Sequence, residues 1–161
     1  MGDSNAVEPT GASRRRGYEV VLFWRPVDWL AIDGNYSASH ARYDNGDHIP
    51  NAFENSAALG VSYVSDDWKA SVRLRHLGPS PLIEDNSVRD KGSTVVNLRG
   101  AREFANVEVY GELLNVFNSR DKDIAYFYES YIPAFDAAPT DGRLSRVVEP
   151  RTVRVGATYR F

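Results

Sequence analysis

The segment Glu149–Phe161, EPRTVRVGATYRF, decides the fold because its side chains alternate in character up to the last residue. From Thr152 onward, polar or small residues alternate with apolar ones, which are Val153, Val155, Ala157, Tyr159 and Phe161. Successive side chains of a strand point to opposite faces, so this period of two predicts a strand with one polar and one apolar face. The apolar face must therefore contact either a protein core or lipid.

Similar alternation recurs along the chain, whereas segments with a helical period are scarce. In residues 68–77, for example, Trp68 and Val72 alternate with Lys69 and Arg73. The sequence predicts an all-β fold of antiparallel, up-and-down strands. The seven predicted strands are Gly17–Arg25, Trp29–Tyr43, Glu54–Val64, Trp68–Leu77, Ser93–Glu103, Asn106–Phe117 and Pro150–Phe161.

The connections between these strands alternate between short and long. The short ones are Pro26–Asp28, Ser65–Asp67 and Phe104–Ala105, and the long ones are Asp44–Phe53, Gly78–Gly92 and Asn118–Glu149. We interpret the long segments as irregular loops, which are uncommon at this length in compact soluble domains. Short turns on one side and long loops on the other are typical of bacterial outer-membrane barrels, whose strands cross the membrane.

Aromatic residues gather at the predicted short turns. Trp24 precedes one turn, Trp29 and Trp68 follow turns, and Tyr159 and Phe161 are expected at the same level. Outer-membrane barrels carry a girdle of aromatic side chains at each membrane interface. The alternative is that each aromatic residue belongs to the core of a β-sandwich, but their shared level favours the girdle.

Composition bounds the possible functions. The chain has 161 residues, 42% of them hydrophobic, and a net charge of −3, which gives no electrostatic reason to expect a nucleic-acid partner. The single basic cluster, Arg14–Arg16, is interpreted as a solvated or headgroup-facing strand end. The absence of cysteine excludes disulfides and thiolate metal sites. We find neither an apolar run of transmembrane-helix length nor a signal peptide in MGDSNAVEPTGASRRR.

No pattern of catalytic or metal-binding residues is present. The spacing of His40, His48 and His76 matches no zinc signature. The acidic pairs of the long loops, Glu84 with Asp85 and Asp121 with Asp123, are interpreted as solvated charge rather than as a general acid and base. We therefore predict no enzyme activity, no catalytic or metal site and no cofactor.

Two stretches near the C-terminal end resemble the C-terminal part of TonB-dependent outer-membrane receptors. The family commonly has an Asn-Leu-Phe-Asp-like element after its penultimate strand, and here Asn115-Val116-Phe117-Asn118 matches it within YGELLNVFNSRDKDIAYFY. Its last strand commonly begins with Glu-Pro-Arg, as at 149–151, and ends in aromatic-basic-Phe, as at 159–161. Upstream, SRRRGYEVVLFWRPVDWLAIDGNYS, HIPNAFE and LRHLGPSPLIEDNS also resemble family segments, so the likeness extends over most of residues 13–161.

The resemblance implies a segment of a barrel of twenty-two strands closed around a plug domain, in the outer membrane of a Gram-negative bacterium. Such receptors import scarce ligands such as ferric siderophores, cobalamin or glycans, with energy delivered through TonB. This chain resembles the last seven strands only, so we expect residues 1–12 to be a polar leading segment and 13–161 an incomplete barrel. TonB and the plug would act through an N-terminal part that is absent here.

The resemblance also implies partners and a signal. Outer-membrane lipid and the barrel-assembly machinery are the expected partners, and Tyr159 and Phe161 would form the C-terminal assembly signal. Ligand-contacting residues stay unassigned. Eight charged residues should face the barrel lumen, either pairing with one another and with a plug or lining a solute path: Asp33, Arg73, Arg75, Arg99, Glu108, Glu112, Arg154 and Arg160.

Two other kinds of protein fit parts of the pattern. One is a small stand-alone outer-membrane barrel, either a membrane enzyme or a lipocalin-like binding protein, although the smallest closed barrels have about eight strands. The other is a secreted β-sandwich adhesin, which would bury its apolar strand faces between two sheets.

Overall fold

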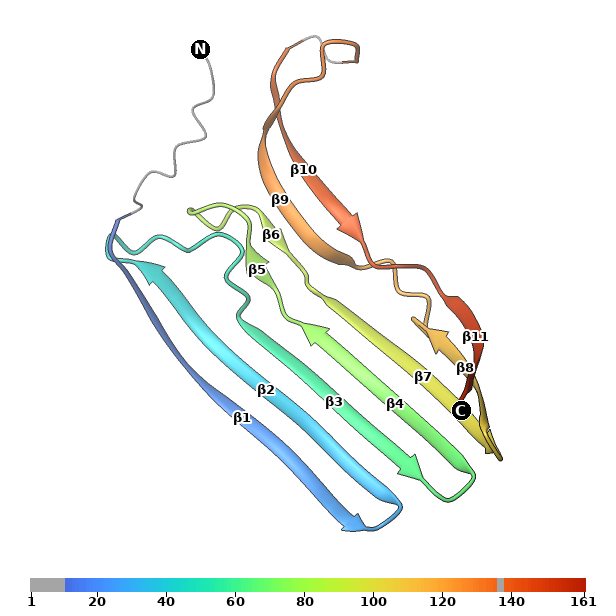
Figure 1. Ribbon diagram of the computed structural model, residues 1–161. Helices are drawn as coiled ribbons and strands as arrows, with labels where there is room; N and C mark the ends of the chain where they lie inside the picture. Colours follow the sequence, from blue (N-terminus) through green and yellow to red (C-terminus); the bar gives the residue numbers. More distant parts are fainter. Residues whose placement is uncertain (1–10, 136–137) are drawn as a thin grey trace.

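The computed structural model describes residues 11–135 and 138–161, and the predicted leading segment 1–12 lies almost wholly outside them. Seven antiparallel strands form one sheet in the order β1-β2-β3-β4-β7-β8-β11 (Figure 1). Their bounds are Ser13–Val27, Leu30–Tyr43, Asn55–Val64, Trp68–Leu77, Ser93–Phe104, Val107–Leu114 and Thr152–Tyr159. The predicted all-β, up-and-down arrangement of seven strands is confirmed. No helix in the described part of the chain is long and apolar enough to cross a membrane.

The predicted segregation of the connections is also confirmed. Tight turns at Asp28–Trp29, Ser65–Asp67 and Ala105–Asn106 lie at one end of the sheet, and the long connections lie at the other (Figure 1). We call these the turn end and the loop end. Ala105 has a φ of 50°, the left-handed conformation that lets so short a turn reverse the chain.

The long connections are more ordered than the sequence predicts. The prediction that Asn118–Glu149 is an irregular loop is wrong. Within it, β9 (Lys122–Ser130) and β10 (Thr140–Val147) pair as an antiparallel hairpin, which we call the second hairpin (Figure 1). The connection between β4 and β7 contains a small hairpin of β5 (Ser80–Pro81) and β6 (Arg89–Asp90). The predicted strand 106–117 is also too long, because β8 ends at Leu114.

The register gives the sheet two distinct faces. On the face that we call outer, large apolar side chains are exposed in every strand of the sheet: Val20, Leu22, Trp24, Tyr36, Leu59, Val72, Leu98, Val109, Val153 and Val155. Val155 is 81% exposed, and the buried apolar residues are few and mostly small. A sandwich would cover this face with a second sheet, and the described residues supply none.

The aromatic side chains at the turn end lie as expected for a girdle. Trp24, Trp68 and Tyr159 project from the outer face, each about half exposed. The rings of Trp29 and Tyr63 lie 5.8 Å apart, and the guanidinium of Arg102 lies 5.0 Å from the centre of the Trp68 ring. These rings are amphipathic, they lie at the border of the apolar outer face, and a cation lies beside one of them. Side chains of this kind are typical of the boundary between membrane hydrocarbon and lipid headgroups.

The two faces predict unequal tolerance of charge. Val155→Arg puts a cation in the middle of the apolar outer face and should destabilise the lipid-inserted sheet by about 2–4 kcal/mol. Thr158→Arg lies on the opposite face, opposite Glu108, and should cost less than about 1 kcal/mol. Urea titration of the whole barrel that contains this sequence, refolded into lipid vesicles and followed by tryptophan fluorescence, measures both. Equal costs would mean that the faces are assigned wrongly.

Candidate functional site

The inner face of the sheet carries a network of ion pairs and three separate pairs. Lys69 Nζ lies 2.7 Å from Glu108 Oε2, and Arg99 lies 3.2 Å from Glu108 and 2.9 Å from Glu112. Arg160, just beyond β11, reaches Glu103 at 2.5 Å. All eight charged residues predicted to pair on this face make at least one ion pair, and the remaining ones are Asp33 with Arg73, Arg75 with Asp123, and Arg154 with Glu149.

Several of these pairs pass over an intervening strand. Asp33 on β2 meets Arg73 on β4 at 2.6 Å, and between them lies Gly60 of β3. A Cβ atom at position 60 would lie 1.8 Å from Arg73 Nη1 and 2.7 Å from Asp33 Oδ1. Glycine at this position therefore leaves the space in which the carboxylate and the guanidinium meet across β3, and a larger residue would make the Arg73 side chain shift.

An aromatic ring covers a second inner-face glycine in the same way. Tyr110 of β8 lies over Gly156 of β11, where a Cβ atom would come within 2.5 Å of the phenol ring. The guanidinium carbon of Arg99 lies 4.2 Å from the centre of that ring. Cation, ring and glycine form a layer, so the inner face is polar yet closely packed at the C-terminal side of the sheet.

The Asn115–Asn118 element forms a tight turn that joins the two motifs recognised from the sequence. Asn115 is 3% exposed, and its Nδ2 donates to the carbonyl oxygens of Ser119 at 2.9 Å and of Glu149 at 2.8 Å. Its Oδ1 accepts from the Ser119 amide at 2.8 Å. Asn118 Oδ1 accepts from the Arg151 amide at 3.0 Å. The first motif therefore holds the Glu-Pro-Arg segment that leads into β11.

The backbone of this turn explains why asparagine occupies both ends. Asn115 has a φ of 48° and Asn118 a φ of 52°, in the left-handed region that asparagine tolerates better than most residues. A short amide side chain can also bond neighbouring backbone groups, as both residues do here. We call residues 115–118 the asparagine clamp.

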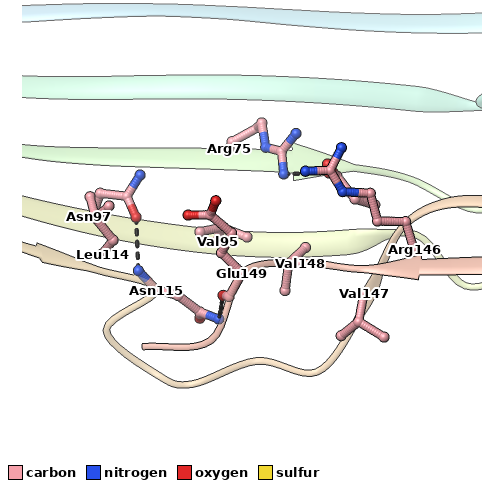
Figure 2. A pocket seen from close by; sticks show the side chains of 10 residues that line it. Arg75, Val95, Asn97, Leu114, Asn115, Arg146, Val147, Val148 and Glu149 are labelled. Carbon is pink, nitrogen blue, oxygen red and sulfur yellow. Dashed lines mark hydrogen bonds and ion pairs between the residues drawn. The ribbon is translucent and has the colours of Figure 1, made fainter. Parts of the chain in front are cut away.

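A cavity of about 290 Å³ lies between the asparagine clamp, the inner face and the start of the second hairpin. Arg75 donates to Asp123 Oδ1 at 2.6 Å there, and Figure 2 shows Arg75 and Arg146 extending toward one another. Glu149 lines the cavity opposite them. Two cations and two anions around a small open space suit water or a polar solute, and the arrangement offers no nucleophile activated by a neighbouring base.

The histidines and loop acids do not form a metal site. His40 accepts from Arg42 Nε at 3.3 Å, His48 Nδ1 lies 2.8 Å from Arg42 Nη1, and His76 lies 2.8 Å from the Thr94 hydroxyl. Asp85 accepts hydrogen bonds from Ser87, which lower the pKa of its carboxyl. Within residues 11–135 and 138–161, no group of three histidine or acidic side chains could hold a metal ion.

Comparison with known proteins identifies the family. The model of the family described as TonB dependent receptor-like, beta-barrel matches residues 2–118. No curated protein matches the sequence. Similar solved structures include the ferric yersiniabactin uptake receptor FyuA from Yersinia pestis (TM-score 0.74, 17% identity, 90% of this chain and 23% of that one). The siderophore receptor PiuA from Acinetobacter baumannii has a TM-score of 0.70 and 16% identity, and the match covers 90% of this chain and 21% of that one. The ferric citrate transporter FecA has a TM-score of 0.67 and 22% identity, and the match covers 96% of this chain and 26% of that one.

The fold of this chain is thus that of a segment of such barrels. It spans between 21% and 26% of the length of the three solved chains. These three solved proteins are described as receptors or as a transporter.

The asparagine clamp predicts a specific pair of substitution effects. Asn115→Gly keeps the left-handed backbone but removes three side-chain hydrogen bonds, so it should cost about 2–3 kcal/mol at about 1 kcal/mol each. Asn115→Ala also strains the backbone and should cost about 1 kcal/mol more. Urea titration of the refolded whole barrel that contains this sequence measures both costs, and the Ser119 amide should lose protection from hydrogen exchange.

The matched control for this experiment is Asn45→Ala, which removes a similar amide from the exposed loop where Asn45 bonds only Asp47. We expect a cost of less than about 1 kcal/mol for it. If Asn115→Gly costs no more than this control, the clamp does not hold the start of β11.

Proposed function

Because the chain belongs to the TonB-dependent receptor-like β-barrel family, we propose that it forms the C-terminal portion of an outer-membrane receptor that imports a scarce ligand. The observation that carries the proposal is the two-faced sheet, which exposes apolar side chains such as Leu22, Val72 and Val155 outside and carries ion pairs inside. A sheet with one face in lipid and the other toward a polar interior is how such receptors enclose a path through the membrane.

The ligand class that we propose is a ferric chelate. Support comes from the names of three of the similar structures, which are receptors or transporters for ferric yersiniabactin, for a siderophore and for ferric citrate. Another similar structure is a copper transporter, OprC. At identities of 22% or less, the likeness itself extends to the fold alone. The plug, the contact with TonB and most of the ligand-binding surface belong, in this proposal, to other parts of the receptor.

The inner face is proposed to contribute a polar wall to the transport path. Most side chains of its ion pairs are roughly one-quarter to one-half exposed, and exposed pairs contribute only about 0–1 kcal/mol each to stability. In this proposal the ion pairs matter for the transport path rather than for stability. They keep the surface polar and hydrated, and because their charges balance, the surface does not strongly attract a passing anion or cation. In this proposal the seven strands of the sheet form this wall.

Uptake measurements test the ligand class. Cells that produce the receptor containing this sequence, in a background unable to make its own chelators, are offered radioactive iron as ferric citrate or as ferric siderophores. We expect accumulation of at least one chelate that disappears when TonB is deleted. Accumulation that is the same with and without TonB, or none for any chelate while the receptor is present in the membrane, would contradict the proposal.

We also propose that Tyr159 and Phe161 form a signal for insertion by the barrel-assembly machinery. The two rings meet edge to face with centres 5.1 Å apart, and both are exposed on the outer side of the turn end. An exposed aromatic pair beside the last strand offers an apolar surface to a partner before lipid covers it. In this proposal the partner contacts the strand that must pair last.

Replacing Phe161 by Asp should sharply lower the amount of receptor inserted in the outer membrane, because a charge replaces the apolar edge of the ring pair. The amount is measured by immunoblotting of outer-membrane fractions at matched synthesis. Thr158→Asp is the control, since Thr158 lies on the inner face of the same strand. Unchanged membrane levels after Phe161→Asp would refute the signal.

A further inference from the structure

A cavity lies at the loop end, between the connection of residues 44–54, the small hairpin of β5 and β6, and strand β9 (Figure 1). Its volume is about 350 Å³, which falls within the range of about 300–1,000 Å³ that is usual for small-molecule sites. Apolar and aromatic side chains form much of its wall: Phe53, Leu77, Ile124, Ala125 and Tyr126. We call it the Asp90 cavity, after the acidic residue of β6 in the same wall.

Backbone hydrogen bonds hold the walls of this cavity in place. The amide of Asn51 donates to the Pro81 carbonyl at 2.8 Å, and the amide of Glu54 donates to the Pro79 carbonyl at 3.0 Å. The two strands of the small hairpin also pair with each other. Since the fold itself builds these walls, a ligand would bind without having to order them first.

The carboxylate of Asp90 is buried in this wall without a partner. The residue is only 6% exposed, and among residues 11–135 and 138–161 its side chain makes no hydrogen bond or ion pair. The two other charged residues of the wall neutralise each other, since Arg75 Nη2 donates to Asp123 Oδ1 at 2.6 Å. The wall of the cavity therefore carries one negative charge that its own residues leave uncompensated.

The neighbouring cations are engaged elsewhere. Arg89 precedes Asp90 in β6, and its guanidinium binds Glu54 and Asn86. Arg143 of β10 donates from Nη2 to the Arg89 carbonyl at 2.8 Å, but within the described part of the chain it forms no ion pair with Asp90. These cations therefore leave the Asp90 carboxylate without a direct partner.

The rest of the chain cannot supply a basic side chain either. Residues 1–10 and 136–137, which lie outside the described ranges, contain no lysine, arginine or histidine. A buried carboxylate is strongly unfavourable unless a counter-charge or hydrogen-bond donors compensate it. The cavity is therefore suited to a cation from outside this chain.

We propose that the Asp90 cavity binds an organic cation from solution, an ammonium or guanidinium group on an apolar or aromatic stem. The Asp90 carboxylate pairs with the cationic group, and Phe53, Leu77 and Tyr126 contact the stem. The cavity is open to solvent, because Ile124 and Tyr126 in its wall are about half exposed. The inference goes beyond the proposed function, since it does not depend on which chelate is imported.

The shape and chemistry of the wall favour an organic cation over a metal ion. In the part of the chain that the structure describes, no group of three histidine or acidic side chains could hold a metal ion. An aromatic ring such as that of Tyr126 also attracts a cation through its face, and apolar walls favour a ligand with an apolar stem.

The test uses the whole receptor that contains this sequence, purified in non-ionic detergent and titrated with two fluorinated probes under fluorine NMR. The probes are para-fluorophenethylammonium and its neutral analogue para-fluorophenethyl alcohol, which have the same aromatic stem. We expect the ammonium to bind at least about tenfold more tightly than the alcohol, because only the ammonium forms a charged hydrogen bond with Asp90. This comparison needs no variant.

The variant Asp90→Asn keeps the shape of the side chain and removes its charge. It should bind the ammonium at least about tenfold more weakly, with an unchanged near-ultraviolet circular dichroism spectrum that shows the receptor is folded. The matched control is Asp141→Asn in β10, where the exposed Asp141 lies opposite Glu129 and outside the cavity wall. Its affinity for the ammonium should stay within about twofold of the wild type.

Equal affinity of the wild type for both probes, or of Asp90→Asn and the wild type for the ammonium, would overturn the proposal. An equal loss of affinity in Asp141→Asn would also overturn it, because the attraction would then come from the general charge of the loops. The absence of ammonium binding to the whole receptor would do the same, since the cavity would then be closed to a soluble cation. Uptake of ferric chelates is a separate measurement, so a failure of the proposed function would be seen independently of this result.

Discussion

Backbone hydrogen bonding between antiparallel strands is the interaction on which the rest of this structure depends. Every amide and carbonyl group of a strand needs a partner, and in hydrocarbon no water can provide one. The ladder from β1 to β11 supplies those partners strand by strand, and β2, β3, β4, β7 and β8 are paired on both sides. Once the ladder is fixed, the period of two in the side chains divides the sheet into an outer and an inner face. Lipid and polar contents can then be separated by a single layer of chain.

Much of this arrangement could be predicted from the sequence. The alternation of polar and apolar residues in 152–161 and 68–77 predicts strands, because each face of a strand meets one environment over its whole length. The second hairpin could not be predicted in this way. In β9, Ile124 and Tyr126 on one side alternate with Ala125 and Phe127 on the other, so both faces are apolar and the period disappears. Its odd-numbered face is used in packing, as the burial of Ala125 indicates.

The asparagine clamp marks a different limit of sequence reasoning. Asn115 and Asn118 are recognised by resemblance, but their roles depend on backbone conformation and on contacts with residues more than thirty positions away. Periodicity carries no information about either. The inner-face charges are an intermediate case. The face on which each charge lies follows from its odd or even position in the strand. The choice of partners, such as Asp33 with Arg73, also depends on whether the position between them, here Gly60 of β3, has a side chain.

The ion pairs that pass over a strand also have a mechanical consequence. Asp33–Arg73 joins β2 to β4, Lys69–Glu108 joins β4 to β8, and Arg160–Glu103 joins the end of β11 to β7. Sliding one strand along its neighbour stretches such a crosslink in addition to the backbone ladder. These ion pairs therefore oppose the sliding of neighbouring strands along one another in the plane of the sheet. Each one is weak, but together they make the sheet stiffer along its strands than hydrogen bonds alone would.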